Sequence, residues 1–133
     1  MSVDVSWRTL VDGDLGEEWE PVTASALERL LDKQLAEYGA TIHDQPTPDG
    51  PLRAEIIFGT RVGQERGAIY YTDKDGAWFS YNTSADDDVP EVYYSDLGFP
   101  PDSEIPLSDL RAALLEYCQT GERPTCIDWK SAD

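Results

Sequence analysis

The stretch over residues 66–95 constrains the fold more than any other part of this sequence. Aromatic and β-branched residues gather in three short segments, and we expect strands over 67–72, 77–81 and 91–95. The polar segment 73–76 separates the first two, and its Asp-Gly end favours the positive φ of a tight reversal. The sequence therefore predicts neighbouring strands joined as a meander.

The expected meander is aromatic on both of its faces. Successive side chains of a strand point to opposite faces, so Tyr70 and Tyr71 lie on different faces, and so do Tyr93 and Tyr94. Helices can cover one face of such a sheet. The other face needs a second covering layer, or it is a place where a partner binds.

Two amphipathic helices flank the central strands. Leucines at helical spacing predict a helix over 23–38, which starts either at Thr23 or in a capping box of Ser25 and Glu28. The spacing of apolar residues after Pro106 predicts a second helix that extends to about residue 119. Both helices are expected to pack a leucine-rich stripe against the core.

The remaining chain supplies further strands and several connections. Alternation of apolar and polar residues predicts a strand over 3–11, and two more are expected over 52–58 and 127–129. Three stretches are interpreted as connectors or loops, with a frayed strand as the alternative for the second: 17–21, 40–51 and 97–101.

Strands grouped between two helices indicate an α+β fold. We expect a single domain over residues 1–133, built on an antiparallel sheet of about five to six strands with two helices packed on one face. No apolar run approaches the roughly 20 residues that span a bilayer. The start of the chain lacks the pattern of a secretory signal, so a cytoplasmic protein is expected.

The charge balance is the most informative feature for function. Ten basic residues against 27 acidic ones give a formal net charge of −17. Such a chain repels phosphate backbones and anionic membranes, so direct binding to nucleic acid or membranes is disfavoured. The same charge attracts a basic protein partner, although acidity can also serve solubility alone.

The sequence offers little that indicates catalysis, a cofactor or a metal. His43 is the only histidine and has no ligand spacing around it, and Cys118 and Cys126 are interpreted as reduced thiols. The carboxylates of residues 86–88 lack the alternate-residue pattern of a calcium loop. We therefore expect no catalytic residue, no cofactor and no metal, and a small hydrolase that uses His43 is a minor alternative.

Several segments of the chain together match the pattern of a known family. They are Tyr70-Tyr71-Thr72-Asp73-Lys74-Asp75-Gly76, Val92-Tyr93-Tyr94, Ile105-Pro106-Leu107-Ser108-Asp109-Leu110-Arg111, Thr120-Gly121-Glu122-Arg123-Pro124 and Ile127-Asp128-Trp129. With these segments the chain resembles the immunity protein 1 family of bacterial polymorphic toxin systems, which is common in actinobacteria. The resemblance extends nearly end to end, and the Gly-Glu-Arg-Pro…Trp ending is its most specific part.

The resemblance implies a cytoplasmic antitoxin that binds one cognate toxin domain, often a nucleic-acid deaminase, and blocks its active site without doing chemistry. A toxin that acts on nucleic acid needs a basic groove, which a protein with a net charge of −17 complements. An acidic adaptor or regulatory domain without a toxin partner is the alternative. We expect a monomer or a weak dimer.

The meander supplies the candidate partner-binding residues, because aromatic anchors hold a complex together while charge steers the approach. The candidate anchors are Tyr70, Trp78 and Tyr93. Cross-strand packing explains these aromatic residues equally well. The candidate acidic flank, which a solvated loop would also explain, consists of Asp73, Asp75, Asp86, Asp87, Asp88 and Glu91.

Overall fold

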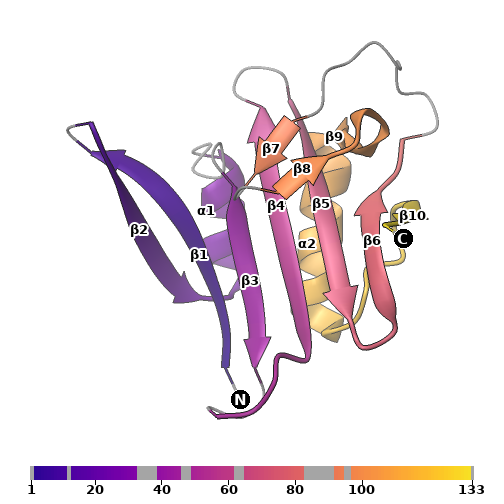
Figure 1. Cartoon of the computed structure of the whole chain (residues 1–133), viewed down its shortest axis with the longest axis horizontal. Helices are drawn as coiled ribbons and strands as arrows, with labels where there is room; N and C mark the ends of the chain where they lie inside the picture. Colours follow the sequence, from indigo (N-terminus) through magenta and orange to yellow (C-terminus); the bar gives the residue numbers. More distant parts are fainter. Residues whose placement is uncertain are drawn as a thin grey trace.

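A large antiparallel sheet forms the centre of the molecule (Figure 1). The computed structural model describes residues 2–11, 13–32, 39–45, 49–61, 65–82, 92–94 and 97–132. The sheet has eight strands, with seven in the order β10-β6-β5-β4-β3-β1-β2 and β9 paired to β5. Its strands are β1 (Ser2–Val11), β2 (Asp14–Pro21), β3 (Ala40–Gln45), β4 (Ala54–Arg61), β5 (Arg66–Asp73), β6 (Gly76–Ser80), β9 (Ile105–Pro106) and β10 (Trp129–Ser131).

The predicted α+β class is confirmed, but the sheet is larger than the five to six strands expected. One reason is that two supposed connections are strands. After a turn at Gly13, whose φ is +85°, the chain reverses into β2, which pairs along its whole length with β1. The stretch expected to be mostly loop contains β3, which lies between β1 and β4 in the middle of the sheet.

The third strand of the expected meander does not extend the main sheet. β7 (Val92–Tyr94) instead pairs with β8 (Leu97–Phe99) in a separate two-stranded sheet, which we call the β7–β8 hairpin. The place beside β6 is taken by β10 from the end of the chain. Figure 1 shows the hairpin in front of the main sheet and both helices behind it.

The described residues contain two α-helices, α1 (Ala24–Asp32) and α2 (Leu107–Thr120), and a short 3₁₀ turn, η1 (Pro101–Ser103), precedes β9. The hydroxyl oxygen of Thr23 accepts a hydrogen bond from the N–H of Ala26 at 3.0 Å, so Thr23 caps α1 as one of the two predicted starts. The rest of the predicted first helix, residues 33–38, lies outside the described residues. Gly121 ends α2 with φ +70°, as expected for a left-handed helix cap.

The main core lies between the helices and the sheet. The described parts of both helical stripes are buried there as predicted, and each fully buried aliphatic or aromatic side chain contributes about 1.5–3 kcal/mol. Leu52, the first residue of the strand expected over 52–58, lies before β4 and is exposed. Apart from two alanines, the buried residues of this core are Val5, Trp7, Leu27, Leu30, Leu31, Ile42, Ile56, Phe58, Ile69, Tyr71, Ile105, Leu110, Leu114 and Tyr117.

A second, smaller core lies on the opposite face of the sheet. It contains the buried side chains of Ala68, Tyr94 and Phe99, with Tyr70 and Phe79 packed against them. The expected separation of Tyr70 from Tyr71 and of Tyr94 from Tyr93 is confirmed, because Tyr71 lies in the main core and Tyr93 is exposed. The aromatic strands β5 and β6 are therefore covered on both faces, by the helices on one side and by the β7–β8 hairpin on the other.

Candidate partner-binding surface

The β7–β8 hairpin sits on the sheet through close contact between Tyr94 and Gly59 of β4. A Cβ atom built at Gly59 would lie 2.0 Å from a ring carbon of Tyr94, so only glycine allows the ring to come this near. Burial of this phenol raises the pKa of Tyr94 to about 12. The hairpin is therefore tied to the sheet by a ring that packs directly on the backbone.

The rest of this side of the sheet is left uncovered by the helices. Residues directly opposite each other in an antiparallel pair share a face, and one cross-strand row passes from Trp19 on β2 to Tyr70 on β5. We call this surface the open face and define it as Asp4, Ser6, Trp19, Thr41, His43, Glu55, Ile57, Tyr70 and Thr72.

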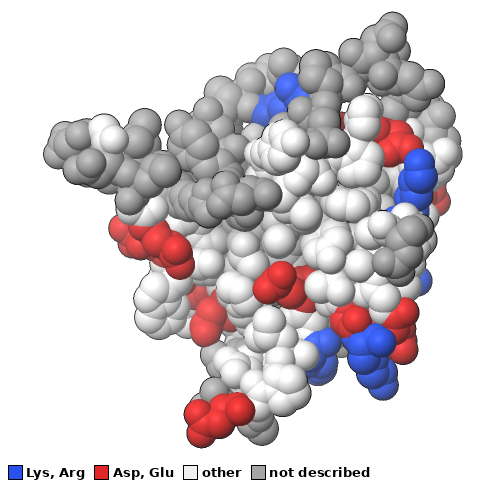
Figure 2. All heavy atoms as spheres, in the orientation of Figure 1, with Lys and Arg blue, Asp and Glu red and all other residues white. Residues whose placement is uncertain are grey.

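Figure 2 shows this side of the molecule. Uncharged residues occupy most of its middle, acidic groups lie among and around them, and basic groups lie at the top, right and lower right of the view. Trp19 is 67% exposed, which is a large apolar area to leave in water. A largely uncharged middle, an exposed aromatic ring and a charged rim together fit the anatomy of a protein-binding surface.

The predicted anchors fall on two different sides of the sheet. Tyr70 lies on the open face and packs against Phe79, with ring centroids 5.1 Å apart. Tyr93 is 64% exposed on the hairpin, and its neighbour Tyr94 turns toward the sheet. Trp78 pairs with Tyr71 and packs against the main core, so the structure does not bring it together with the other two.

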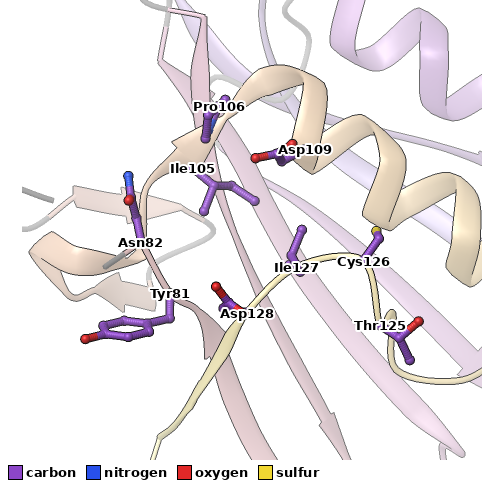
Figure 3. A pocket seen from close by; sticks show the side chains of 9 residues that line it. All are labelled: Tyr81, Asn82, Ile105, Pro106, Asp109, Thr125, Cys126, Ile127 and Asp128. Atoms are coloured by element: carbon purple, nitrogen blue, oxygen red, sulfur yellow. The ribbon is translucent and has the colours of Figure 1, made fainter. Parts of the chain in front are cut away.

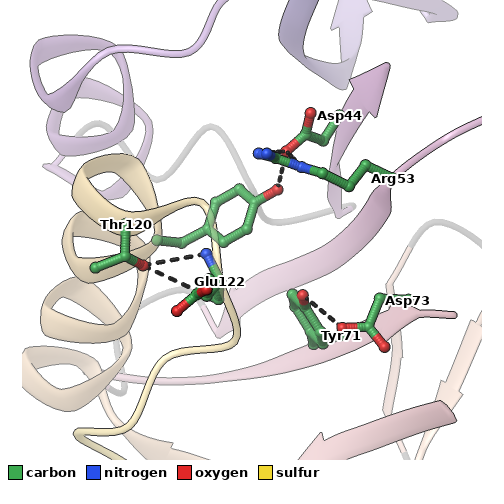
Figure 4. Close-up of polar contacts among 7 residues, drawn as sticks. Asp44, Arg53, Tyr71, Asp73, Thr120 and Glu122 are labelled. Atoms are coloured by element: carbon green, nitrogen blue, oxygen red, sulfur yellow. Dashed lines mark hydrogen bonds and ion pairs between the residues drawn. The ribbon is translucent and has the colours of Figure 1, made fainter. Parts of the chain in front are cut away.

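The predicted acidic flank is described only in part. Asp73 accepts hydrogen bonds from the hydroxyl of Tyr71 at 2.9 Å (Figure 4) and from the N–H of Asp75 at 2.8 Å. Its carboxylate therefore shapes the turn between β5 and β6, while the side chain of Asp75 is exposed. The other members of the predicted flank, Asp86, Asp87, Asp88 and Glu91, lie outside the described residues.

Trp19 is the residue that sequence reasoning missed. It was interpreted as part of a connector, whereas β2 places it opposite Ser6 on the open face. The signal was the Asp12-Gly13 pair, because two turn residues of this type after an alternating strand favour a hairpin. A return strand paired to β1 would have placed Trp19 on the face opposite to the core residues Val5 and Trp7.

A buried polar cluster fastens α2 to the sheet where the central strands β3 and β4 are connected. Asp44 is fully buried and accepts hydrogen bonds from the hydroxyl of Tyr117 at 2.6 Å and from Arg53, with which it also forms an ion pair (Figure 4). Burial, followed by the bond to Asp44, raises the pKa of Tyr117 above its ordinary value. The separate hydrogen bond from Arg53 to Asp44 raises the pKa of the Arg53 guanidinium. These contacts hold α2 against the sheet, so the role of the cluster is structural.

The arrangement around His43 separates it from its sequence neighbour. His43 and Asp44 are adjacent on β3, so they point to opposite faces of the sheet. The Nε2 atom of His43 lies 3.2 Å from a carboxylate oxygen of Glu55 on the open face. The minor hydrolase alternative would therefore have to use Glu55 rather than Asp44.

The surface pocket in Figure 3 lies between the end of β6, the start of α2 and the C-terminal segment. Its volume is about 220 Å³, which is below the usual range for small-molecule sites of about 300–1,000 Å³.

Within the described ranges, no group of three or more His, Cys, Asp or Glu side chains could hold a metal ion. The helices among those residues lack the combination of length and apolar character needed to cross a membrane.

Comparison with known protein families supplies the decisive observation. The family model of immunity protein Imm1 matches residues 16–131, which is nearly the whole chain. The chain belongs to the Imm1 family of immunity proteins. No curated protein matches it.

The most specific motif of the Imm1 resemblance has a structural role in this chain. The guanidinium of Arg123 stacks on the ring of Trp78 at 3.9 Å from the ring centre, and the indole N–H of Trp129 donates to the carbonyl of Pro124 at 2.7 Å. β10, which begins at Trp129, then pairs with β6. The Gly-Glu-Arg-Pro…Trp ending thus fastens the C-terminal segment to the edge of the sheet.

Proposed function

We propose that this Imm1 protein neutralises a toxin domain that acts on nucleic acid, with a nucleic-acid deaminase as the first choice of partner, by covering the toxin's active site. The match of the Imm1 family model over residues 16–131 is the observation that supports an immunity role most strongly. The nature of the toxin and the mode of inhibition are inferred from charge and surface chemistry.

The charge of the chain favours a partner that handles polyanions. An enzyme that acts on nucleic acid presents a basic groove to the phosphate backbone. A protein with a net charge of −17 is attracted to such a groove and competes with the nucleic acid for it. In this proposal the protein contributes binding alone and performs no reaction.

The open face supplies the contacts that would hold the complex. Trp19 and Tyr93 are two large, exposed aromatic residues on the same side of the sheet, and such residues carry much of the binding energy in protein interfaces. Tyr70 lies on the same side of the sheet, but it is half-buried against Phe79. Trp19 and Tyr93 are therefore the proposed principal anchors.

The test is co-expression with the toxin domain encoded next to this protein's gene. Cells that express the toxin are expected to survive only when this chain is also present, and the purified pair is expected to form a stable complex at low salt. Failure to rescue the cells together with the absence of a complex would contradict the proposal. It would favour an acidic adaptor, whose partner would come from elsewhere.

A further inference from the structure

The sheet has one long edge, and β2 forms it. Of the two terminal strands in the order of the sheet, β10 has three residues and β2 has eight. Within the described parts of the chain, β2 pairs with β1 alone, and Figure 1 shows it as the outermost strand. A long edge strand offers its unpaired backbone groups to another strand.

The register of the β1–β2 pair identifies which backbone groups point outward. The N–H of Val22 donates to the carbonyl of Val3 at 2.9 Å, so these two residues form a hydrogen-bonded pair. Hydrogen-bonded and non-bonded pairs alternate along an antiparallel ladder. The residues of β2 whose N–H and C=O groups point toward β1 are therefore Glu20, Glu18 and every second residue before them.

The backbone groups of Glu17 and Trp19 consequently point away from β1. The register pairs Ser6 with Trp19 and Arg8 with Glu17, and both are non-bonded pairs by this alternation. Pro21 occupies the next outward position, where its missing N–H removes no bond to β1. With respect to the described strands, β2 therefore presents at least two unpaired N–H groups and their carbonyls along one edge.

The side chains of β2 indicate which kind of strand could add there. The strand contains four acidic residues and no basic one, and the exposed side chains of Glu17 and Glu18 flank the outward edge. Glu20 is already paired with Arg29 of α1. A second copy of β2 would place acidic residues against acidic residues, whereas a cationic strand would be attracted.

We propose that β2 accepts an extended, cationic segment of the toxin domain as an added strand, with Trp19 packing over it from the open face. This inference rests on the proposed function and specifies how that partner is held. Backbone hydrogen bonds would supply part of the affinity, and the indole ring and the glutamates would supply specificity.

The test compares two substitutions at one position. Glu17→Ala removes the carboxylate and keeps the outward N–H, whereas Glu17→Pro removes both, and the fixed φ of proline is compatible with an edge strand. The adjacent toxin domain, made catalytically inactive, is titrated with each variant after circular dichroism has verified that both fold. Glu17→Pro is expected to bind at least about 10-fold more weakly than Glu17→Ala, because one hydrogen bond and the close approach of the added strand are lost.

Amide exchange in the unmodified protein gives a second measurement that does not depend on a variant folding. The N–H groups of Glu17 and Trp19 are expected to exchange quickly in the free protein and slowly in the complex, while that of Glu18 is protected in both. Equal binding of the two Glu17 variants, or unchanged exchange at Glu17 and Trp19 in a complex that does form, would overturn the added strand and leave the immunity role intact. If no complex forms at all, the proposed function itself fails.

Discussion

Asp44 of β3 and Tyr117 of α2 form a buried hydrogen-bonded pair. The hydroxyl of Tyr117 donates to the buried carboxylate at 2.6 Å, and the second oxygen of Asp44 has no hydrogen-bond partner among the described residues. Tyr117→Phe is expected to lower the free energy of unfolding by about 2 kcal/mol, because hydrogen bonds to buried charges are worth about 1.5–3 kcal/mol. Urea denaturation measures this change.

Tyr70→Phe is the matched control, because Tyr70 lies on the open face and its stability contribution comes from ring packing. The control is expected to stay within about 0.5 kcal/mol of the unmodified protein. Equal effects of the two substitutions would mean that the bond to Asp44 contributes little to stability.

Trp19 and Tyr93 carry the residue-scale prediction for binding. Trp19→Ala and Tyr93→Ala are each expected to weaken toxin binding by at least about 10-fold, which equals 1.4 kcal/mol, because large aromatic anchors dominate interface energies. Leu52→Ala is the control, since Leu52 is also an exposed apolar residue but lies outside the open face. Calorimetric titration measures all three. If the control weakens binding as much as the aromatic variants do, the open face is not the binding surface.

At the scale of elements, the contact between β4 and the β7–β8 hairpin depends on Gly59. Gly59→Ala is expected to destabilise the protein by about 1–3 kcal/mol, because the new methyl group would collide with the ring of Tyr94. The collision disappears when the ring is absent. Gly59→Ala should therefore cost much less in a Tyr94→Ala background than in the unmodified protein, and urea denaturation of the four proteins measures the difference. Equal costs in both backgrounds would show that the ring is not what excludes a side chain at position 59.

The helices were more predictable from the sequence than the strands because their apolar periodicity extends over several turns. The leucines of α1 and α2 occupy the core positions expected for them. β3 was harder to predict because the proline-rich stretch that follows it resembles a loop, while Ala40 and Ile42 give only a short alternating pattern. The hairpin could not be placed because nothing local to residues 92–94 distinguishes pairing with β6 from pairing with β8.

The candidate site was predictable only for the residues whose face follows from alternation. Tyr70 and Tyr93 were correctly separated from Tyr71 and Tyr94, which are buried in the two cores. Placing Trp78 relative to Tyr70 required the register of β5 and β6, which pairs Trp78 with Tyr71 instead. A shift of one residue in that register would have reversed the face of every side chain in β6.

For the whole molecule, three buried tyrosines predict a loss of stability at alkaline pH. Burial raises the pKa of Tyr71, Tyr94 and Tyr117 above their ordinary value near 10, and that of Tyr94 reaches about 12. Above pH 10 the unfolded chain releases these protons while the folded chain keeps them. These groups therefore make their full contribution to the free energy of unfolding below pH 10. That contribution is lost as the pH rises toward the pKa values of the folded state, by about 1.4 kcal/mol per pH unit for each group.

Urea denaturation between pH 8 and pH 11.5 measures this alkaline loss. Tyr94→Phe should lower overall stability little at pH 8 and should reduce the steepness of the decline above pH 10. A decline of unchanged steepness in this variant would contradict the role assigned to the buried phenol of Tyr94.

The central claim is that an acidic protein covers the nucleic-acid site of its toxin, and competition tests it most directly. The activity of the adjacent toxin domain is measured on a polynucleotide substrate while the concentrations of substrate and of this protein are varied. The proposal predicts that inhibition is complete at one protein per toxin and that excess polynucleotide relieves it. Inhibition that excess substrate leaves unchanged, or a toxin that stays active in the presence of saturating protein, would contradict it.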